Sequence, residues 1–246
     1  MSLLKIDNLR KDFDLDGMDI RALNGIYLEV EAGELIVVVG RSGSGKTTLL
    51  RILAGLETKT SGIIEFRGKQ MDENNMLPVG MVFQEPRLLP WLSVEKNILF
   101  PFLAKGGYAA NRQTSARLLE MLGLKNYANA LPSQLSGGMA QRVALGRALS
   151  GDPEIVLLDE PLGSLDYFTR AALQDELLRL YLSGGKTFIM VTHDVVEALL
   201  LATRVLVLKN GEIVHTLDVG LEYPRLRGGV ELQAMAAEVL SAVGDD

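Results

Sequence analysis

The sequence contains no cysteine, which excludes disulfide bonds and thiolate metal sites and fits a reducing compartment. It also lacks any uncharged run approaching the ~18–20 residues that a membrane helix needs. The most apolar window, 195–208, carries Glu197 and Arg204. Residues 1–7 lack the long apolar stretch of a secretory signal. We therefore expect a chain that is soluble by itself.

Positive charge is also scarce, because 25 Lys and Arg residues face 31 Asp and Glu residues, for a net charge of −6. No global basic field is present, so composition gives no support for a nucleic-acid partner. The remaining composition, 48% hydrophobic and 23% charged, is ordinary for a globular protein. At 246 residues the chain is long enough for one large α/β domain with a substantial core.

The most informative stretch is GRSGSGKT at residues 40–47, which follows the β-branched run 35–39 and precedes helical leucine spacing in 48–54. This is the phosphate-loop motif in its strand–loop–helix context, which argues against a mere glycine-rich turn. Backbone N–H groups of such a loop and of the helix start bind phosphate oxygens. The Lys46 charge would lie on the β- and γ-phosphates, and the Thr47 hydroxyl can ligate Mg²⁺. The predicted phosphate-binding residues here are Gly40, Arg41, Ser42, Gly43, Ser44, Gly45, Lys46, Thr47 and Thr48.

Two carboxylates, Asp159 and Glu160, follow the apolar run 155–158. At the tip of a strand beside a phosphate loop, Asp159 could hold Mg²⁺ directly or through water. Glu160 could orient and deprotonate the attacking water, a contribution typically worth ~10²–10⁴-fold. Two acids after a strand are by themselves more often a solvated turn, and the phosphate loop upstream favours the functional interpretation.

A second glycine pair occurs in the segment 135–142, LSGGMAQR. Ser136 as N-cap, followed by Gly137 and Gly138, gives a helix start whose backbone donors can bind an anion. Taken alone, the segment is more often merely a capped helix with a flexible start, and by itself it favours that interpretation.

The remaining pattern alternates strands and helices, which predicts a mainly parallel sheet with antiparallel pieces at the start and end. A polar turn is expected at 11–17, a hairpin at Asn210-Gly211, and a capping box at Asp194 and Glu197. The tail from about residue 218 has helical spacing near its end and carries no motif that we interpret. Strands are expected at 4–9, 26–31, 35–39, 61–68, 79–83, 155–158, 187–191, 204–208 and 212–216, and helices at 48–54, 93–100, 112–122, about 136 to 152, and 166–182.

Together these motifs resemble those of the ATP-binding-cassette (ABC) ATPases, and they occur along the chain in the same order as in that family. The resemblance runs from Leu4 to about Leu217 and rests on the phosphate loop, Gln84, the Leu-Ser-Gly-Gly of 135–138, Leu-Leu-Asp-Glu at 157–160, Ser-Leu-Asp at 164–166, and His193. Leu-Ser-Gly-Gly distinguishes this family from other phosphate-loop NTPases. Residues 82–94, VFQEPRLLPWLSV, and the Leu-Ser-Gly-Gly-Met sequence further resemble the nitrate/sulfonate/taurine branch of bacterial importer ATPases.

The resemblance implies an α/β fold of the P-loop NTPase, ABC ATPase type. This fold has a mainly parallel sheet core, an antiparallel β subdomain and a helical insertion. The whole chain, 1–246, would be a single nucleotide-binding domain. Its α/β ATP-binding core and β subdomain would comprise 1–85 and 151–217, the helical signature subdomain 86–150, and the C-terminal tail 218–246.

The resemblance also implies a head-to-tail dimer in which Lys46 and Thr47 of one copy hold ATP and Mg²⁺. Ser136 and Gly138 of the other copy, with Gly137 between them, would close on the γ-phosphate. The remaining roles are Mg²⁺ contact by Thr47, Gln84 and Asp159, catalysis by Glu160, Gln84 and His193, communication across the dimer by Asp166, and adenine stacking by Phe13. Phe13 could instead be a minor core residue, and an isolated histidine is more often a surface or capping residue. His215 is interpreted as structural.

Some positions depart from the usual family pattern: Met139, Ala140, Leu162 and Ser164. None of them removes a group needed for phosphate or metal chemistry. Trp91, with Leu88, Leu89 and Leu92, is either core of the helical insertion or part of a partner surface. In the family this region receives a short helix of the membrane subunit.

The predicted function is the ATPase subunit of a bacterial importer. Its partners would be transmembrane permease subunits and, through them, a substrate-binding protein. It would lie peripherally at the cytoplasmic face of the membrane, without a nucleic-acid partner, and serve a small solute of the nitrate, sulfonate or taurine kind. The alternatives are a soluble ABC ATPase acting on nucleic acid or ribosomes, an export or lipoprotein-release cassette, and a non-hydrolysing regulatory cassette. The 113 residues from Lys46 to Asp159 leave no room for the long coiled-coil insertion that soluble ABC ATPases of nucleic acid or ribosomes generally need. A non-hydrolysing regulatory cassette is disfavoured because Glu160, Gln84 and His193 are all present.

Overall fold

The computed structural model describes residues 2–72, 75–103, 107, 111–163 and 165–244. The chain divides into two compact units. The first, Met1–Leu77 with Gly184–Asp246, contains the phosphate loop, and we call it the loop unit. The second, Pro78–Ser183, contains the Leu-Ser-Gly-Gly segment, and we call it the signature unit. Each is described by itself.

One sheet of the loop unit is antiparallel and has the strand order β2-β1-β4-β5. Its strands are β1 (Leu4–Leu15), β2 (Met18–Val30), β4 (Ser61–Phe66) and β5 (Lys69–Gln70). Buried and exposed side chains alternate along β1 because successive residues of a strand point to opposite faces. The polar turn expected at 11–17 is wrong for residues 11–15, which continue β1 and pair with β2. The turn is confined to Asp16 and Gly17, both at positive φ, as a tight hairpin requires.

The other strands of the loop unit follow the order β10-β9-β3-β8. They are β3 (Leu35–Val39), β8 (Thr187–Thr192), β9 (Arg204–Lys209) and β10 (Glu212–Asp218). Strand β3 is parallel to both β8 and β9, and β10 is antiparallel to β9. Every residue of β3 and β8 is buried, as expected for parallel strands covered on both faces. The mainly parallel arrangement and the Asn210-Gly211 hairpin are thereby confirmed.

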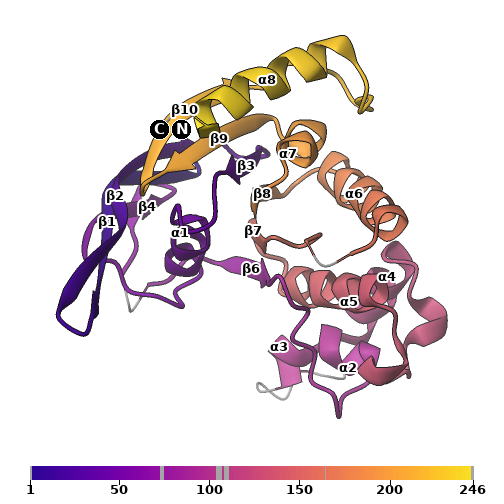
Figure 1. Cartoon of the computed structure of the whole chain (residues 1–246). Helices are drawn as coiled ribbons and strands as arrows, with labels where there is room; N and C mark the ends of the chain where they lie inside the picture. Colours follow the sequence, from indigo (N-terminus) through magenta and orange to yellow (C-terminus); the bar gives the residue numbers. More distant parts are fainter. Residues whose placement is uncertain (1, 73–74, 104–106, 108–110, 164, 245–246) are drawn as a thin grey trace. The chain divides into compact units, whose positions relative to one another are not determined.

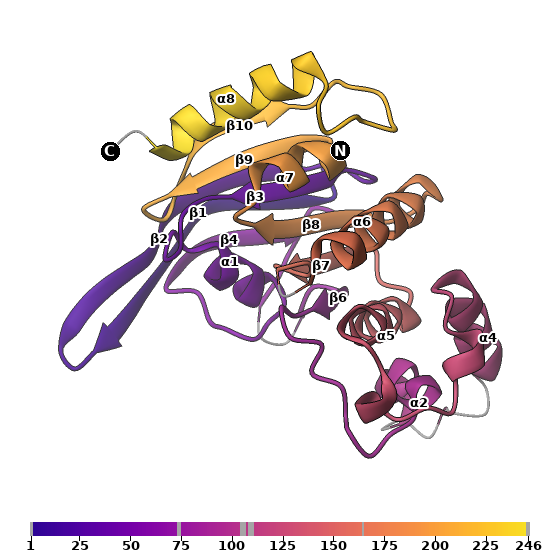
Figure 2. The same ribbon diagram turned by 45° about the vertical axis from the view of Figure 1, so that its right-hand side comes forward.

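The described residues of the loop unit also form the helices α1 (Lys46–Leu53), α7 (Val195–Leu201) and α8 (Val230–Gly244). Helix α8 runs along β9 and β10 and also contacts α7 (Figures 1 and 2). Its buried residues, Leu232, Ala236 and Val239, recur at helical spacing. The helix expected near the end of the tail is therefore present.

The signature unit contains the parallel strand pair β6 (Val79–Val82) and β7 (Ile155–Asp159). Its helices are α2 (Val94–Ile98), α3 (Phe100–Leu103), α4 (Arg112–Met121), α5 (Gly137–Ser150) and α6 (Tyr167–Leu182), with 3-10 turns η2 (Lys125–Tyr127) and η3 (Pro132–Gln134). Helix α5 is central, because it contacts α2, α3, α4, α6 and β6 (Figure 1). The subdomain boundaries proposed from the sequence, 86–150, lie within this unit. Among the described residues, no helix is both long and apolar enough to cross a membrane.

Candidate nucleotide-binding site

The phosphate loop leaves the end of β3 at Gly40 and enters α1 at Lys46. Gly45, the N-cap of α1, has φ 103°, which favours glycine. A Cβ at Gly45 would collide with the carbonyl of Ala22, and a Cβ at Gly40 with the carbonyl of Leu208. The loop is therefore packed directly against backbone on two sides, which restricts its course.

Lys46 is buried, with 6% of its surface exposed. Its Nζ donates to the carbonyl oxygens of Gly40 at 2.8 Å and Arg41 at 3.0 Å. These bonds hold the ammonium group against the loop and satisfy a charge that is rarely buried without partners. The site therefore presents a fixed positive charge together with the backbone donors of a helix start, the combination that binds phosphate.

The turn of the β9–β10 hairpin is hydrogen-bonded to this loop. Gly211 donates its N–H to the carbonyl of Ser44 at 3.1 Å and accepts at its own carbonyl from Asn24 N at 2.8 Å. Gly211 has φ 77°, and a Cβ there would lie 2.9 Å from three backbone atoms of residues 22–24. The sequence predicted this glycine as a hairpin residue only, and its contact with the phosphate loop was not predicted.

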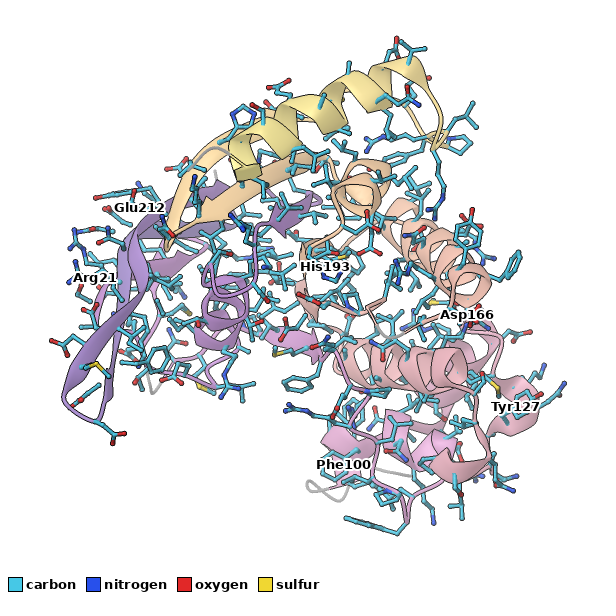
Figure 3. The ribbon with its side chains drawn as sticks, in the orientation of Figure 1. Arg21, Phe100, Tyr127, Asp166, His193 and Glu212 are labelled. Atoms are coloured by element: carbon cyan, nitrogen blue, oxygen red, sulfur yellow. The ribbon has the colours of Figure 1, made fainter. Side chains whose placement is uncertain are left out.

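His193 lies at the same edge of the sheet as the phosphate loop. In the parallel register of β3 and β8, Val39 pairs with Thr192, so Gly40 and His193 follow paired residues. His193 is exposed (labelled in Figure 3), and Asp194 directly after it caps α7 by accepting from Glu197 N at 3.0 Å. The predicted helix start at Asp194 is confirmed, and the surface alternative for His193 agrees with its exposure.

Phe13 lies on β1 opposite Ile20 and is half-buried. The Lys11 Nζ lies 4.5 Å from the centre of its ring and forms an ion pair with Glu57 at 2.8 Å. Phe13 is thus a partly exposed ring beside a paired cation, and its role in adenine stacking stays a prediction.

Three predicted site residues of the signature unit lie at the ends of β6 and β7. Asp159 ends β7 and is 8% exposed. Glu160 has φ 43°, a left-handed conformation that a non-glycine residue adopts at a cost and that is concentrated at functional sites. A Cβ built on Gly163 would lie 3.5 Å from Glu160 Oε2 and 3.6 Å from Gln84 Nε2. The fold therefore brings the carboxyl of Glu160 and the amide of Gln84 to the same glycine.

The Leu-Ser-Gly-Gly segment forms a capped helix start, as predicted. The Ser136 hydroxyl accepts from Met139 N at 3.3 Å, and Gly137 and Gly138 form the first residues of α5. A Cβ at Gly138 would collide with Cγ2 of Thr169, in the first turn of α6. This first turn is capped by Asp166, which accepts from the backbone N–H groups of Phe168 and Thr169, each at 3.1 Å (Figure 3). Hydrogen bonds from the Thr169 side chain and backbone lower the pKa of Asp166, so it is ionised at neutral pH.

Two residues of α5 that sequence reasoning missed hold the segment around Gln84. Gln141, 3% exposed, donates Nε2 to the carbonyl of Phe83 at 3.2 Å. Arg147 donates Nη1 to the carbonyl of Arg87 and Nη2 to that of Pro86, both at 2.8 Å. These contacts join residues about 60 positions apart, and no local pattern in the sequence signals them.

The structure therefore gathers the predicted residues in separate groups. In the loop unit, the phosphate loop, Lys46 and His193 share one edge of a sheet. In the signature unit, Gln84 and Glu160 meet beside Gly163, and the Ser136–Gly138 start of α5 adjoins the Asp166 cap of α6. Thr48 lies in α1, directly after the loop. Ser164, part of the Ser-Leu-Asp motif, lies outside the described residues.

A glycine loop between a buried parallel strand and a helix, with a buried lysine held against it, defines a phosphate-loop nucleoside triphosphatase. The family described as "ABC transporter" matches residues 23–163, and the chain belongs to it. The chain is 48% identical over 221 residues to "Aliphatic sulfonates import ATP-binding protein SsuB 2" of Pseudomonas syringae pv. tomato, covering 89% of this chain and 90% of that protein. It is 43% identical to "Uncharacterized ABC transporter ATP-binding protein MJ0412" of Methanocaldococcus jannaschii, covering 99% and 92%.

Among solved structures, a dimeric post-hydrolysis state of the ATP-binding cassette MJ0796, bound to ADP and Pi, is similar with a TM-score of 0.78 and 31% identity. The match covers 89% of this chain and 100% of that one. The predicted family, the fold class and the ATPase activity are thereby confirmed. The relatives favour the importer prediction over an ATPase of nucleic acid or ribosomes.

Proposed function

We propose that this chain is the ATP-hydrolysing subunit of an importer for aliphatic sulfonates or closely similar small anions. The observation that carries the proposal is the presence in one chain of a loop built to bind phosphate and a capped helix start without side chains at Gly137 and Gly138. The second element serves a nucleotide held by another copy. The sulfonate substrate is proposed from the names of relatives that are 43–48% identical to this chain.

In this proposal Lys46 and the backbone N–H groups of residues 40–47 bind the phosphates of ATP. Mg²⁺ would be held by the oxygens of Thr47, Asp159 and Gln84, and such hydroxyl, carboxylate and amide oxygens are the ligands that this ion prefers. When bound, the ion neutralises charge that develops on the phosphates. Phe13 contributes the aromatic ring against which the adenine stacks.

Hydrolysis needs a base that faces water and an orienting group beside it. Glu160 supplies the base, and the amide of Gln84, which borders the same glycine, orients the water. His193 contacts the γ-phosphate from the sheet edge that it shares with the phosphate loop. As the water oxygen bonds to the γ-phosphorus, the bond from that phosphorus to the β–γ bridging oxygen breaks and ADP leaves, while the proton of the water passes to the carboxylate of Glu160.

The second copy completes each site. Ser136, Gly137 and Gly138 of one copy would close on the γ-phosphate held by the other, as an N-terminal helix turn can donate several N–H groups to an anion. Asp166, ionised and adjacent to that turn through Thr169, would report closure between the two sites. The dimeric cassette among the solved structures supports this arrangement.

An apolar surface on the signature unit is the proposed docking site for the permease subunits. Trp91 is 71% exposed, so the core alternative is wrong for this residue. Its loop is fixed by the fully buried Asn97, whose Nδ2 donates to the carbonyls of Leu89, Leu92 and Ser93. Phe100 and Tyr127, labelled in Figure 3, are exposed on the same unit. A rigid loop that presents a tryptophan to solvent is typical of an interaction surface.

Co-purification from the native membrane tests the proposal. The tagged chain should retain a polytopic membrane subunit at comparable amount after gentle solubilisation and should lie peripherally at the cytoplasmic face. Trp91→Ser should release that subunit while the ATPase rate of the isolated chain is unchanged. Leu226→Ser, which alters an equally exposed residue of the loop unit, is the control and should retain it.

Growth on an alkanesulfonate as sole sulfur source tests the substrate. A strain that lacks this gene should fail to grow on the alkanesulfonate but should grow on sulfate. Recovery of the tagged chain with ribosomes or DNA, rather than with a membrane subunit, would refute the importer proposal. Normal growth of the deletion strain on alkanesulfonates would refute only the substrate.

A further inference from the structure

We infer that Arg225, in the tail, is a positioning residue for hydrolysis: it holds the C-terminal end of α7 and thereby fixes His193 at the other end. The inference rests on the role proposed above for His193. All the residues in the argument belong to the loop unit.

Helix α7 is short and begins two residues after His193 in the chain. Its seven residues, Val195–Leu201, are too few for a helix that is stable without outside contacts. His193 is the single residue between the end of β8 at Thr192 and the N-cap at Asp194. Asp194 N also donates to Thr192 Oγ1 at 3.1 Å. The backbone of His193 is therefore held at both ends, by β8 and by the N-cap of α7. A shift of α7 would move His193 relative to the phosphate loop.

The C-terminal end of α7 is held by the tail. A helix leaves its last carbonyls without partners inside the helix. Arg225 Nη1 donates to the carbonyls of Leu199 at 2.7 Å and Ala202 at 2.6 Å, and the Tyr223 hydroxyl donates to that of Leu201 at 2.6 Å. The guanidinium also lies at the negative end of the helix dipole, which is favourable for a cation.

Arg225 is itself fixed in one orientation. Its Nε donates to the carbonyl of Leu221 at 3.0 Å and its Nη2 to that of Val219 at 3.1 Å. The guanidinium carbon lies 4.1 Å from the centre of the Tyr223 ring. Four carbonyl acceptors and one aromatic face match the planar fork of arginine, and the point charge of lysine cannot satisfy them all.

A contact that served stability alone would leave the chemistry of correctly folded molecules unchanged. The placement of α7 between Arg225 and His193 instead predicts a loss in kcat. Misplacement of a reacting group by about 1 Å can cost as much as ~10²-fold in rate. We therefore expect Arg225→Ala to lower kcat by about ten-fold or more, with a change in KM for ATP below about threefold.

A double-mutant cycle on the full chain, measured by phosphate release, separates the two roles. If Arg225 acts through His193, Arg225→Ala should lower kcat by less than about twofold further in a His193→Ala background. Arg227→Ala, which removes an exposed arginine two residues away, is the matched control and should retain the wild-type kcat. Arg225→Lys should recover only part of the rate.

The outcomes are distinguishable. If His193→Ala retains the wild-type kcat, the proposed role of His193 fails and the inference fails with it. If His193→Ala lowers kcat and the Arg225 effect multiplies in the double variant, the proposed function stands and the inference is overturned. Should Arg225→Ala not fold, Tyr223→Phe removes one hydrogen bond to α7 and must give the same non-additive pattern on a smaller scale.

Discussion

The phosphate loop and the Leu-Ser-Gly-Gly helix start are both glycine-rich segments that we propose bind phosphate, and they are built in different ways. The phosphate loop is packed against backbone: the Leu208 and Ala22 carbonyls border Gly40 and Gly45, and Gly211 bonds to Ser44. The helix start is packed against a side chain, because Gly138 meets the methyl group of Thr169. The surrounding signature unit is likewise tied by side chains, such as Gln141 and Arg147, that donate to distant carbonyls.

The two kinds of packing determine which substitutions each site can tolerate. At Gly40 and Gly45 the nearest obstructing atoms are backbone carbonyls, which a side-chain substitution on the neighbouring residue does not remove. A site framed by side chains can be adjusted by a compensating change on the partner. We therefore expect the two sites to respond differently to the same glycine-to-alanine change.

The largest expected effect concerns the chemistry that both sites serve. Glu160→Gln removes the proposed base and preserves shape, so the rate of phosphate release should fall by ~10²–10⁴-fold. ATP should still bind with an affinity close to that of the wild type, because Lys46 and the loop are unchanged. Phosphate release and equilibrium nucleotide binding measure the two quantities. A variant that keeps the wild-type turnover would contradict the assignment of Glu160.

The next prediction tests the backbone-framed site. Gly40→Ala places a Cβ against the carbonyl of Leu208 and should cost about 3 kcal/mol in the free energy of urea unfolding. Gly43→Ala is the control within the same loop. A Cβ at Gly43 meets open space, and only its φ of 82° is unfavourable, so about 1 kcal/mol is expected. Equal losses in the two variants would show that the Leu208 contact has no effect.

The loss of stability caused by a glycine-to-alanine change should be reversible at the Leu-Ser-Gly-Gly helix start, where the obstructing atom belongs to a side chain, but not at the phosphate loop. Gly138→Ala should destabilise the chain by about 1–3 kcal/mol, because the new Cβ meets Cγ2 of Thr169. The double variant Gly138→Ala with Thr169→Ser removes that methyl group, keeps the hydroxyl, and should recover most of the loss. Gly137→Ala, whose Cβ would only touch Leu165 at 3.6 Å, should be close to neutral. Failure of the serine to rescue would remove the distinction between the two sites.

The smallest expected effect concerns a buried ion pair between α5 and α6. Arg142 Nε lies 2.7 Å from Glu176 Oε2, and Glu176 is 4% exposed. Burial raises the pKa of Glu176 above its ordinary 4.5, opposed by the charge of Arg142. An acid with a raised folded pKa contributes stability that is complete below pH 4.5 and is lost as pH rises through the folded pKa.

Glu176→Gln removes this titration. The stability of the variant relative to wild type should therefore rise as pH increases from 4.5 to 8. This trend is expected whether the variant is more or less stable than wild type at a given pH. Thermal melts of both proteins across that range give the difference. A relative stability that does not change with pH would show that Glu176 does not titrate differently in the folded chain.

The same contrast explains which features could be predicted from sequence. The phosphate loop, the capped start at Ser136 and the Asn210-Gly211 hairpin follow from local rules for strands, caps and turns, and each is confirmed. The turn expected at 11–17 was wrong in extent, because cross-strand pairing with β2 outweighed the polar character of Lys11 to Leu15. Gln141, Arg147 and Arg225 were missed because their acceptors are backbone carbonyls, which any sequence provides.

The bond between Gly211 and Ser44 also orders events during synthesis. The phosphate loop emerges from the ribosome before Gly211, the glycine that bonds to it, because Gly211 lies far downstream of Ser44 in the chain. A nascent chain can therefore form β3 and α1 but cannot complete the packing of the loop between them until the β9–β10 hairpin has been translated. The growing polypeptide should therefore bind nucleotide poorly until Gly211 can bond to Ser44.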